Sequence, residues 1–421
     1  MLSTLRNAWK IPDLRSRILF TLLMIVIFRL GSAVPVPGID SAALAAAFSN
    51  SEDGLLGLFN LMSGGNFKTF TIFALGISPY ITASIVLNLL QIAFPALEAL
   101  AKEGETGRKK IAQYTRYLTV VLALIQGIGF SLGYFQRFFI NPGAWSTFIA
   151  VLTLTAGTAF LMYLGEKITD KGIGNGISLF IFAGIIASLP SAILSMYTNL
   201  TLGQMNIFQV IFFAVLAVII IMGIIFIQQG QRKIPVQYAK RVVGRKMYGG
   251  QTTHIPLKVN QAGVIPVIFA ISILMFPATI AAFFPGGGFA KFVGDWLSQT
   301  GIIYNLLYAL LIIFFTYFYT NITFNPVDVA DRLKTNGGFI PGIRPGRPTA
   351  EHLSKSLNKI TIVGAIFLAG IAILPNILGA VTNTQFSFGG TSLLIVVSVS
   401  LETMKQVEAQ MLMRHYEGFL N

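Results

Sequence analysis

The sequence predicts an all-α polytopic membrane protein, and three observations support this fold class. The chain of 421 residues is 54% hydrophobic and only 11% charged, with a mean hydropathy of +0.72. A soluble core cannot bury so much apolar surface, so we expect a bilayer to be the solvent of many side chains. The other two observations are ten long apolar runs and an uneven distribution of Lys and Arg along the chain.

Ten apolar runs approach the roughly 20 residues that a helix needs to cross about 30 Å of hydrocarbon. They lie at about 18–34, 71–90, 117–132, 148–164, 177–189, 210–227, 262–284, 302–320, 360–374 and 393–413. The fifth run is short, and the tenth contains Glu402, Lys405 and Glu408. The basic start of the chain enters the first run without a small-residue cleavage site, which favours a retained span over a removed signal peptide.

The basic residues test this count of spans, because cytoplasmic loops hold most of the Lys and Arg of a membrane protein. With the N-terminus inside, 26 of the 30 Lys and Arg residues fall in cytoplasmic segments. The external segments hold Lys68, Arg137 and Lys291, and Arg29 lies within the first run. This asymmetry predicts an even number of spans with both termini cytoplasmic.

Ten spans divide into two halves of five, residues 1–200 and 201–421. Because five is odd, the second half would enter the membrane in the opposite orientation, as in inverted-repeat membrane proteins. The two halves show no convincing repeat at the level of residues, so the sequence permits this symmetry without requiring it.

Two stretches differ from plain spans. The stretch 54–66, GLLGLFNLMSGGN, is too short to cross the membrane and ends at a Gly-Gly pair. The residues alone slightly favour an interfacial amphipathic helix there over a re-entrant half-helix. The seventh span contains Pro266 and Pro277, each of which removes a backbone donor, so we expect a kinked helix with either a static bend or a hinge.

The sequence lacks the patterns of common catalytic and cofactor sites. It has no Cys, three His outside any HExxH pattern and no GxxxxGK[ST] loop. The alternating glycines of GIGNGIS at 172–178 predict a tight loop rather than a phosphate site. We therefore expect no enzymatic activity, no cofactor and no metal. The alternative to a channel is an ion-coupled secondary transporter of inverted-repeat architecture, although the first nine spans hold no central acid.

Long strings in the sequence carry more information than its composition. They are VPVPGID at 34–40, SGG and IFALGISPYITASI within 63–85, EGETGRKKIAQYTRY at 103–117, GTAFLMYLGEKITDKGIGNGIS at 157–178, YAKRVVGRKMYGGQTTHIPLKVNQAGVIPVIFA at 238–270, FNPVDVADRLKTNGGFIPGIRPGRPTAEHL at 324–353 and FGGTSLLIVVSV at 388–399. In order and spacing they resemble the bacterial SecY family, the channel subunits of the Sec protein translocon. The resemblance implies ten transmembrane helices in two inverted five-helix halves around an hourglass pore. It also implies a plug helix at about 55–65, which favours the re-entrant alternative, and a lateral gate towards lipid.

The resemblance also implies roles for residues that their spacing does not single out. An aliphatic pore ring falls on Ile77, Ile81, Ile177, Ile181, Ile268 and Ile395. The plug falls on Leu55, Leu56, Leu58, Phe59, Asn60, Leu61, Met62, Ser63 and Gly64. Amides that line the lateral gate, between spans two and three on one side and seven and eight on the other, fall on Asn88, Gln126 and Asn260. Taken singly, each isoleucine fits a lipid-facing or core position, and each amide fits ordinary helix packing.

Two basic loops, at about 228–260 and 324–356, are expected to bind partners. Three prolines and two glycines in PGIRPGRP at 341–348 predict a shaped loop rather than a loose tether. By resemblance, the partner-binding residues are Arg241, Arg245, Lys246, Arg344 and Arg347. The implied partners are the SecE and SecG subunits, the SecA motor ATPase, the ribosome through its rRNA phosphates, secretory preproteins with signal sequences, and membrane lipid. The implied function is a protein-conducting channel that passes unfolded secretory polypeptides across the cytoplasmic (inner) membrane and releases hydrophobic segments laterally into it.

Overall fold

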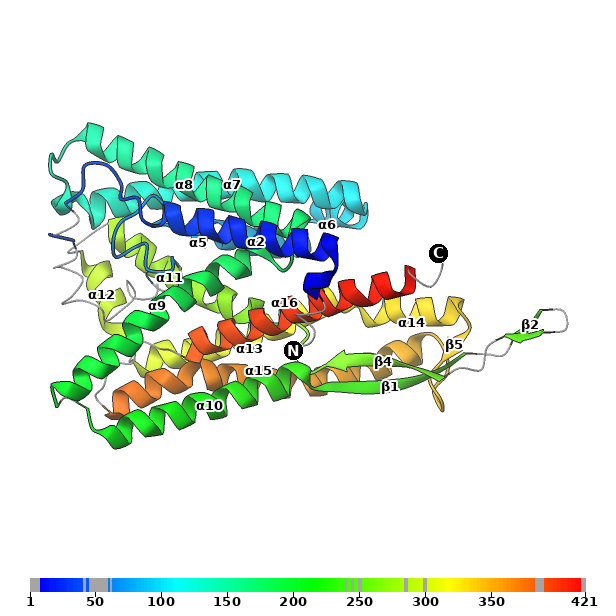
Figure 1. Ribbon diagram of the computed structural model, residues 1–421. Helices are drawn as coiled ribbons and strands as arrows, with labels where there is room; N and C mark the ends of the chain where they lie inside the picture. Colours follow the sequence, from blue (N-terminus) through cyan, green and yellow to red (C-terminus); the bar gives the residue numbers. More distant parts are fainter. Residues whose placement is uncertain are drawn as a thin grey trace.

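The computed structural model describes residues 8–40, 43–44, 60, 63–203, 205–238, 241–243, 246–248, 252–283, 287–297, 301–382 and 390–417. Long helices form the main body, and a strand-built extension projects from one end of it (Figure 1). We call this end the strand end. The opposite end, where the short helix α12 (Gly288–Trp296) lies, is called the α12 end.

Each of the ten predicted runs overlaps one helix. These helices are α2 (Pro12–Gly31), α5 (Ser78–Ala93), α7 (Glu105–Gly133), α8 (Ala144–Lys171), α9 (Gly176–Thr201), α10 (Ile207–Gln229), α11 (Ile265–Phe283), α13 (Ile302–Thr323), α15 (Arg347–Thr382) and α16 (Gly390–Glu417). Successive members run in opposite directions, and α2 begins and α16 ends toward the strand end (Figure 1). This is the arrangement expected of an even number of spans.

Length and composition alone identify fewer spans than ten. Among the described residues, six helices are long and apolar enough to cross a membrane: α7, α8, α9, α10, α13 with its continuation, and α15. A seventh span results if α5 and α6 (Pro95–Lys102), which meet at a bend of 102°, count as one. The bend falls at Phe94, whose extended backbone suits the residue before a proline. The prediction of ten spans is consistent with these helices.

Two details of the predicted helices need correction. The second helix begins at Ser78, not near residue 71, because the chain turns at Gly76, where φ is 56°, and Pro79 fits the first helical turn. Pro266 likewise lies at the start of α11, where its missing N–H leaves no helical hydrogen bond unmade, whereas Pro277 lies inside the helix. Of the two prolines, only Pro277 therefore removes a hydrogen-bond donor from the interior of the helix, where a kink is expected.

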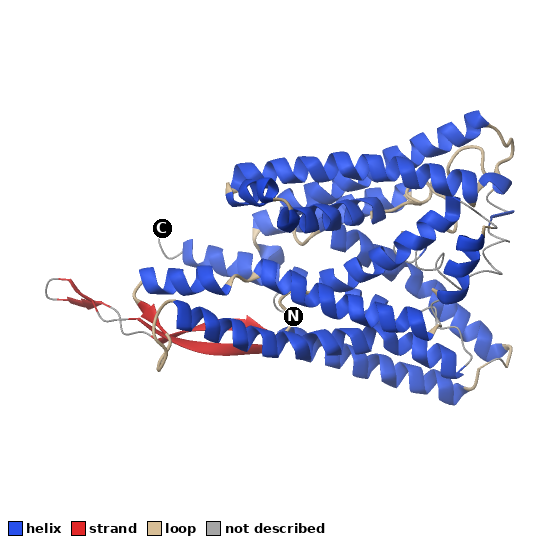
Figure 2. Cartoon of the chain, turned by 180° about the vertical axis from the view of Figure 1, so that it is seen from behind, coloured by secondary structure: helices blue, strands red, loops and turns tan. Residues whose placement is uncertain are grey.

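The all-α prediction omits the extension at the strand end. β1 (Gln231–Tyr238) pairs antiparallel with both β4 (Thr252–Lys258) and β5 (Gly338–Phe339), in the order β4-β1-β5. β2 (Arg241–Val243) and β3 (Lys246–Tyr248) form a separate antiparallel pair beyond it (Figure 2). The sequence does hold a strand signal here, since buried Ile234 and Val236 alternate with exposed neighbours along β1.

A hydrophobic cluster joins the two basic loops into one packed unit. It draws on β1, β4, α14 (Pro326–Thr335), the segment after β5 and the start of α15, through Ile234, Val236, Leu257, Leu333, Ile340, Leu353 and Leu357. The β1–β5 pairing connects the same loops through their backbones, with Gln237 opposite Phe339. The two loops therefore form one platform, a conclusion that neither loop's sequence gives alone.

Candidate functional site

The six isoleucines of the expected pore ring belong to four helices or their caps. Two lie at the start of α5, two in α9, one in α11 and one in α16: Ile77, Ile81, Ile177, Ile181, Ile268 and Ile395. Five of them are at most 6% exposed, and Ile177 is partly buried against the same hydrophobic cluster. The helices pack in pairs, α5 against α11 and α9 against α16. The five buried side chains therefore do not face lipid, and that all six close one ring stays a prediction.

A tight turn between α8 and α9 positions the two ring isoleucines of α9. Side chains of α2, α16 and α8 accept hydrogen bonds from its backbone: Thr21 Oγ1 from Ile173 N (3.0 Å), Gln406 Oε1 from Gly174 N (2.9 Å) and Thr169 Oγ1 from Gly176 N (3.0 Å). A Cβ atom at Gly176 would lie 2.0 Å from the carbonyl oxygen of Gly165, so only glycine fits there. The expected tight loop is confirmed, and the polar side chains that fix it were not singled out by the sequence.

The three amides of the expected lateral gate differ in their surroundings. Asn88 in α5 is half-buried, whereas Gln126 in α7 and Asn260 before α11 are 5% and 6% exposed. Asn260 Nδ2 donates to the carbonyl of Gly263 at 2.9 Å, and its Oδ1 has no hydrogen-bond partner among the described residues. Gln126 Oε1 is likewise buried, and no described residue bonds it. Because a buried unpaired oxygen costs roughly 1–3 kcal/mol, both amides suit an interface that rearranges.

The helices expected to form that gate are in contact. α11 packs against α5, α7 and α13. The Phe269 ring of α11 meets the Phe315 ring of α13 edge-on at 5.7 Å. The structure therefore brings the proposed gate helices together, with α11 at the junction.

We expect Asn260→Leu to change which hydrophobic segments open the gate. Leucine removes a buried oxygen that is unpaired in the closed state and costs roughly 1–3 kcal/mol there, so the closed gate becomes more stable and the export ratio of weak to strong signal sequences should fall about fivefold or more. Export of a matched pair of reporter proteins measures this ratio. Asn376→Leu is the control, because Asn376 donates to Asn305 at 2.8 Å between α15 and α13. Equal effects of Asn260→Leu on both reporters would contradict the gate role.

Most of the expected plug lies outside the described residues. This holds for Leu55, Leu56, Leu58, Phe59, Leu61 and Met62. The described Asn60, Ser63 and Gly64 belong to a hydrogen-bonded turn, in which Asn60 O accepts from Gly65 N at 2.8 Å. Whether the predicted plug helix is interfacial or re-entrant depends on residues that lie outside the described part of the chain, so both alternatives stay predictions.

Four of the five expected partner-binding residues are described, and they lie on the platform at the strand end. Arg241 and Lys246 lie on β2 and β3, and Arg245 lies outside the described residues. Arg344 is exposed, and Arg347, also exposed, bonds Glu351 at 3.1 Å.

The loop that carries Arg344 has a defined shape, as its prolines and glycines predict. Gly342 and Gly346 have φ of 80° and 95°, a conformation that favours glycine. Thr349 Oγ1 donates to the Arg344 carbonyl at 2.8 Å, and Ile343 packs against the hydrophobic cluster of the platform. The Arg344 side chain is therefore presented to solvent from a fixed backbone.

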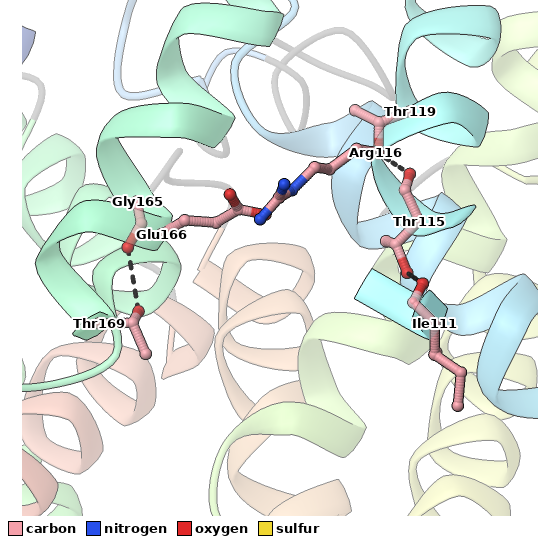
Figure 3. Close-up of polar contacts among 7 residues, drawn as sticks. All are labelled: Ile111, Thr115, Arg116, Thr119, Gly165, Glu166 and Thr169. Carbon is pink, nitrogen blue, oxygen red and sulfur yellow. Dashed lines mark hydrogen bonds and ion pairs between the residues drawn. The ribbon is translucent and has the colours of Figure 1, made fainter. Parts of the chain in front are cut away.

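An ion pair between α7 and α8 was not singled out by the sequence. Arg116 Nε lies 2.8 Å from Glu166 Oε1, and Figure 3 shows the arginine reaching across to the neighbouring helix. Thr115 and Thr119, which flank it on α7, bond the carbonyls one turn earlier in their own helix. Residues 50 positions apart give no local signal for such a pair. The pair ties the expected gate helix α7 to α8.

We expect the coupling energy of Arg116 and Glu166 to be about 0.2–1 kcal/mol, because their side chains are 50% and 22% exposed. It should fall at high salt. A double-mutant cycle with Arg116→Ala and Glu166→Ala, read by unfolding in detergent at two salt concentrations, measures it. The Arg347–Glu351 pair, 91% and 68% exposed, is the control and should couple more weakly. A coupling that is zero, or that does not respond to salt, would contradict this.

The buried side chains among the described residues are mainly apolar, and they include the amides Gln126 and Asn260. Among the residues that the structure describes, no three His, Asp or Glu side chains form a group that could hold a metal ion. The outer faces of the helices are apolar, and Phe208 and Phe226 of α10 are 80% and 78% exposed. Such faces suit lipid. Together these features define a multi-pass helical membrane protein with an apolar interior.

Solved structures specify the fold. The chain matches one described as "The structure of a protein conducting channel" with a TM-score of 0.66 at 19% identity, covering 93% of this chain and 91% of that one. It also matches Sec61 in the canine ribosome-channel complex from the endoplasmic reticulum, with a TM-score of 0.61 at 16% identity, covering 93% and 91%. The chain thus has the fold of protein-conducting channels.

Sequence relatives extend along the whole chain. The family model described as SecY matches residues 71–404. Protein translocase subunit SecY of Streptomyces scabiei is 49% identical over 441 residues, covering 100% of both chains. The protein of the same name from Escherichia coli (strain K12) is 47% identical over 416 residues, covering 97% of this chain and 94% of that one. The chain belongs to the SecY family.

Proposed function

We propose that this chain passes unfolded secretory polypeptides through its centre and releases hydrophobic segments laterally into the membrane. The observation that carries the proposal is its full-length likeness, at 49% identity, to a protein translocase subunit. The chain is a translocation channel of the SecY family. The ion-coupled transporter considered as an alternative has no support from the relatives reported above.

An aliphatic constriction would keep such a channel shut when it is empty. Six isoleucine side chains around a narrow neck offer water and ions no hydrogen bonds, so the neck dewets. The side chains can still separate, because dispersion contacts of ~0.1–0.2 kcal/mol per atom pair have no fixed direction. The burial of five of the six isoleucines supports this assignment.

A hydrophobic segment would open the lateral gate by partitioning into it. A signal sequence has 7–15 apolar residues, and strong hydrophobes contribute about −0.3 to −0.6 kcal/mol each. Several kcal/mol of preference for the open state is enough to invert a closed-to-open ratio. The unpaired buried oxygens of Gln126 and Asn260 support a weakly held closed interface.

The platform at the strand end is the proposed binding surface for partners. Its exposed Arg344 and Arg347 suit phosphate groups and acidic protein surfaces, because a guanidinium forms two parallel hydrogen bonds to either. A matching Sec61 channel was solved in a complex with a ribosome, which favours rRNA as one partner. We further propose the SecA motor and the SecE and SecG subunits as partners. Because we expect no enzymatic activity in this chain, the energy for transport would come from such a partner.

The distribution of charge supports the proposed location and orientation. We place the chain in the cytoplasmic membrane with the strand end and both termini on the cytoplasmic side. The basic loops that form the platform lie at that end, as positively charged cytoplasmic loops should.

A photo-crosslinking amino acid at Ile81 or Ile268 tests the function directly. A secretory polypeptide stalled during export should crosslink at both positions, because both side chains would line its path. Ile280, on the same helix as Ile268 but 37% exposed, is the control and should crosslink lipid. Polypeptide adducts at Ile280 alone would contradict passage through the centre.

A further inference from the structure

The turn that ends the expected plug packs backbone to backbone against α9. A Cβ atom built on Gly64 would lie 2.7 Å from Gly184 Cα, and one built on Gly184 would lie 2.7 Å from Gly64 Cα. Real Cβ atoms essentially never come so close, so this packing requires glycine at both positions. Gly64 also has φ of 71°, which strains any other residue.

Gly184 lies on the face of α9 that carries two of the ring isoleucines. Ile177, Ile181 and Gly184 follow the spacing i, i+4 and i+7, which places them on one helical face. At 1.5 Å per residue, Gly184 lies about 4.5 Å beyond Ile181 along the axis. Because α9 runs toward the α12 end (Figure 1), the glycine is next to the expected ring on that side.

The turn that meets Gly184 is held in a fixed shape. Asn60 Oδ1 accepts from Lys68 N at 3.0 Å, and Ser63 Oγ accepts from Phe67 N at 3.0 Å. Asn66 Nδ2 donates to the Ser63 carbonyl at 2.6 Å. Ser63 is 4% exposed and Asn66 is 2% exposed, so these bonds are sheltered from water. The turn therefore acts as a rigid base.

Aromatic rings attach this base to the end of α7. Phe67 meets Phe130 and Phe135 edge-on, with 5.2 Å between centroids in each case, and Phe70 lies 3.9 Å from Phe135. On the other side, Arg29 of α2 donates to the carbonyl of Ala183, the residue before Gly184. Both the turn and its contact on α9 are thus tied to neighbouring helices.

We propose that Gly184 is the seat of the plug, a gap on the ring-bearing face of α9 that admits the backbone at Gly64 and holds the plug turn over the constriction. Gly184 and Asn60 are then positioning residues for the closed channel. The inference rests on the proposed channel function, since a seat has a role only where a plug closes a pore.

The test uses Gly184→Ala in the full-length chain within its membrane complex. The added methyl group cannot fit against Gly64, so the turn must lift. We expect resting ion conductance to rise about fivefold or more, a size typical of an overpacked contact. A cysteine introduced by Thr71→Cys measures the turn directly. Thr71 is 2% exposed, its N–H bonds the Asn66 carbonyl of the turn at 3.1 Å, and its hydroxyl has no hydrogen-bond partner among the described residues, so the substitution removes no bond of the base. The chain has no other cysteine. Modification of this cysteine by a membrane-impermeant maleimide should accelerate by a similar factor in the Gly184→Ala background.

Gly370→Ala is the matched control, because Gly370 lies in α15 and a Cβ atom there meets none of the atoms that the structure describes within 4 Å. It should leave both measurements unchanged.

Asn60→Ala is a second test variant. It adds no atoms and removes the acceptor for Lys68 N, so it weakens the turn without creating a steric clash. It should also accelerate modification of the cysteine.

The two variants separate the outcomes. Unchanged conductance and unchanged cysteine modification in both Gly184→Ala and Asn60→Ala would overturn the seat. If Gly184→Ala does not fold, the modification rate in Asn60→Ala decides alone. The cysteine measurement needs no transported polypeptide, so it is independent of the proposed function. Failure of the wild-type complex to pass a polypeptide would instead contradict that function.

Discussion

Replacing Ile268 by asparagine is expected to make the resting channel leak ions. Ile268 is 6% exposed in α11 and belongs to the main hydrophobic cluster. An amide in the proposed neck offers water a hydrogen bond of about 1 kcal/mol net, which corresponds to roughly a fivefold rise in conductance. Ile81→Asn, from the facing helix α5, should act in the same direction. Planar-bilayer recording of the purified complex without substrate measures the effect.

The same substitution on the outer face of α11 separates the neck from general damage to the helix. Ile280 is 37% exposed, so Ile280→Asn should leave the resting conductance unchanged. Equal conductance in Ile268→Asn, Ile81→Asn and the wild type would show that these residues do not form the aliphatic constriction that closes the empty channel.

Charge reversal at Arg344 is expected to reduce motor-driven export at least about tenfold. Hydrogen bonds between ionised groups contribute roughly 1.5–3 kcal/mol, and a glutamate would also repel an acidic or phosphate partner. Arg344 is exposed, so the free energy of unfolding should change by no more than about 0.5 kcal/mol. Export into inverted membrane vesicles, together with unfolding in detergent, checks both statements.

Lys171→Glu is the control that makes the same charge reversal outside the platform. Lys171 is exposed at the end of α8, outside the two platform loops, and carries the same charge. It should leave export close to that of the wild type. Normal export by Arg344→Glu, or an equal loss in Lys171→Glu, would contradict the assignment of Arg344 to the binding surface.

The positions of the helices were predictable because the signal for a membrane span is local. About 20 successive apolar residues must satisfy their backbone groups within one helix, so each run in the sequence overlaps one helix of the structure. The shaped loop around Arg344 was predictable for the same reason, since proline and glycine restrict the chain at their own positions. β1 has an alternating pattern of buried and exposed residues, but it lies within a segment whose many Lys and Arg residues predicted only a cytoplasmic loop, so the strand was not predicted.

The sequence by itself determined the membrane class, the helix positions, the basic loops and, by resemblance, the family. Only the tertiary structure decided which distant segments meet: the joining of the two loops by β1 and β5, the Arg116–Glu166 pair, and the contact of Gly64 with Gly184. The reason is physical. A span or a turn is set by neighbours along the chain, whereas an ion pair or a glycine contact depends on how whole helices pack, and no local pattern records that packing.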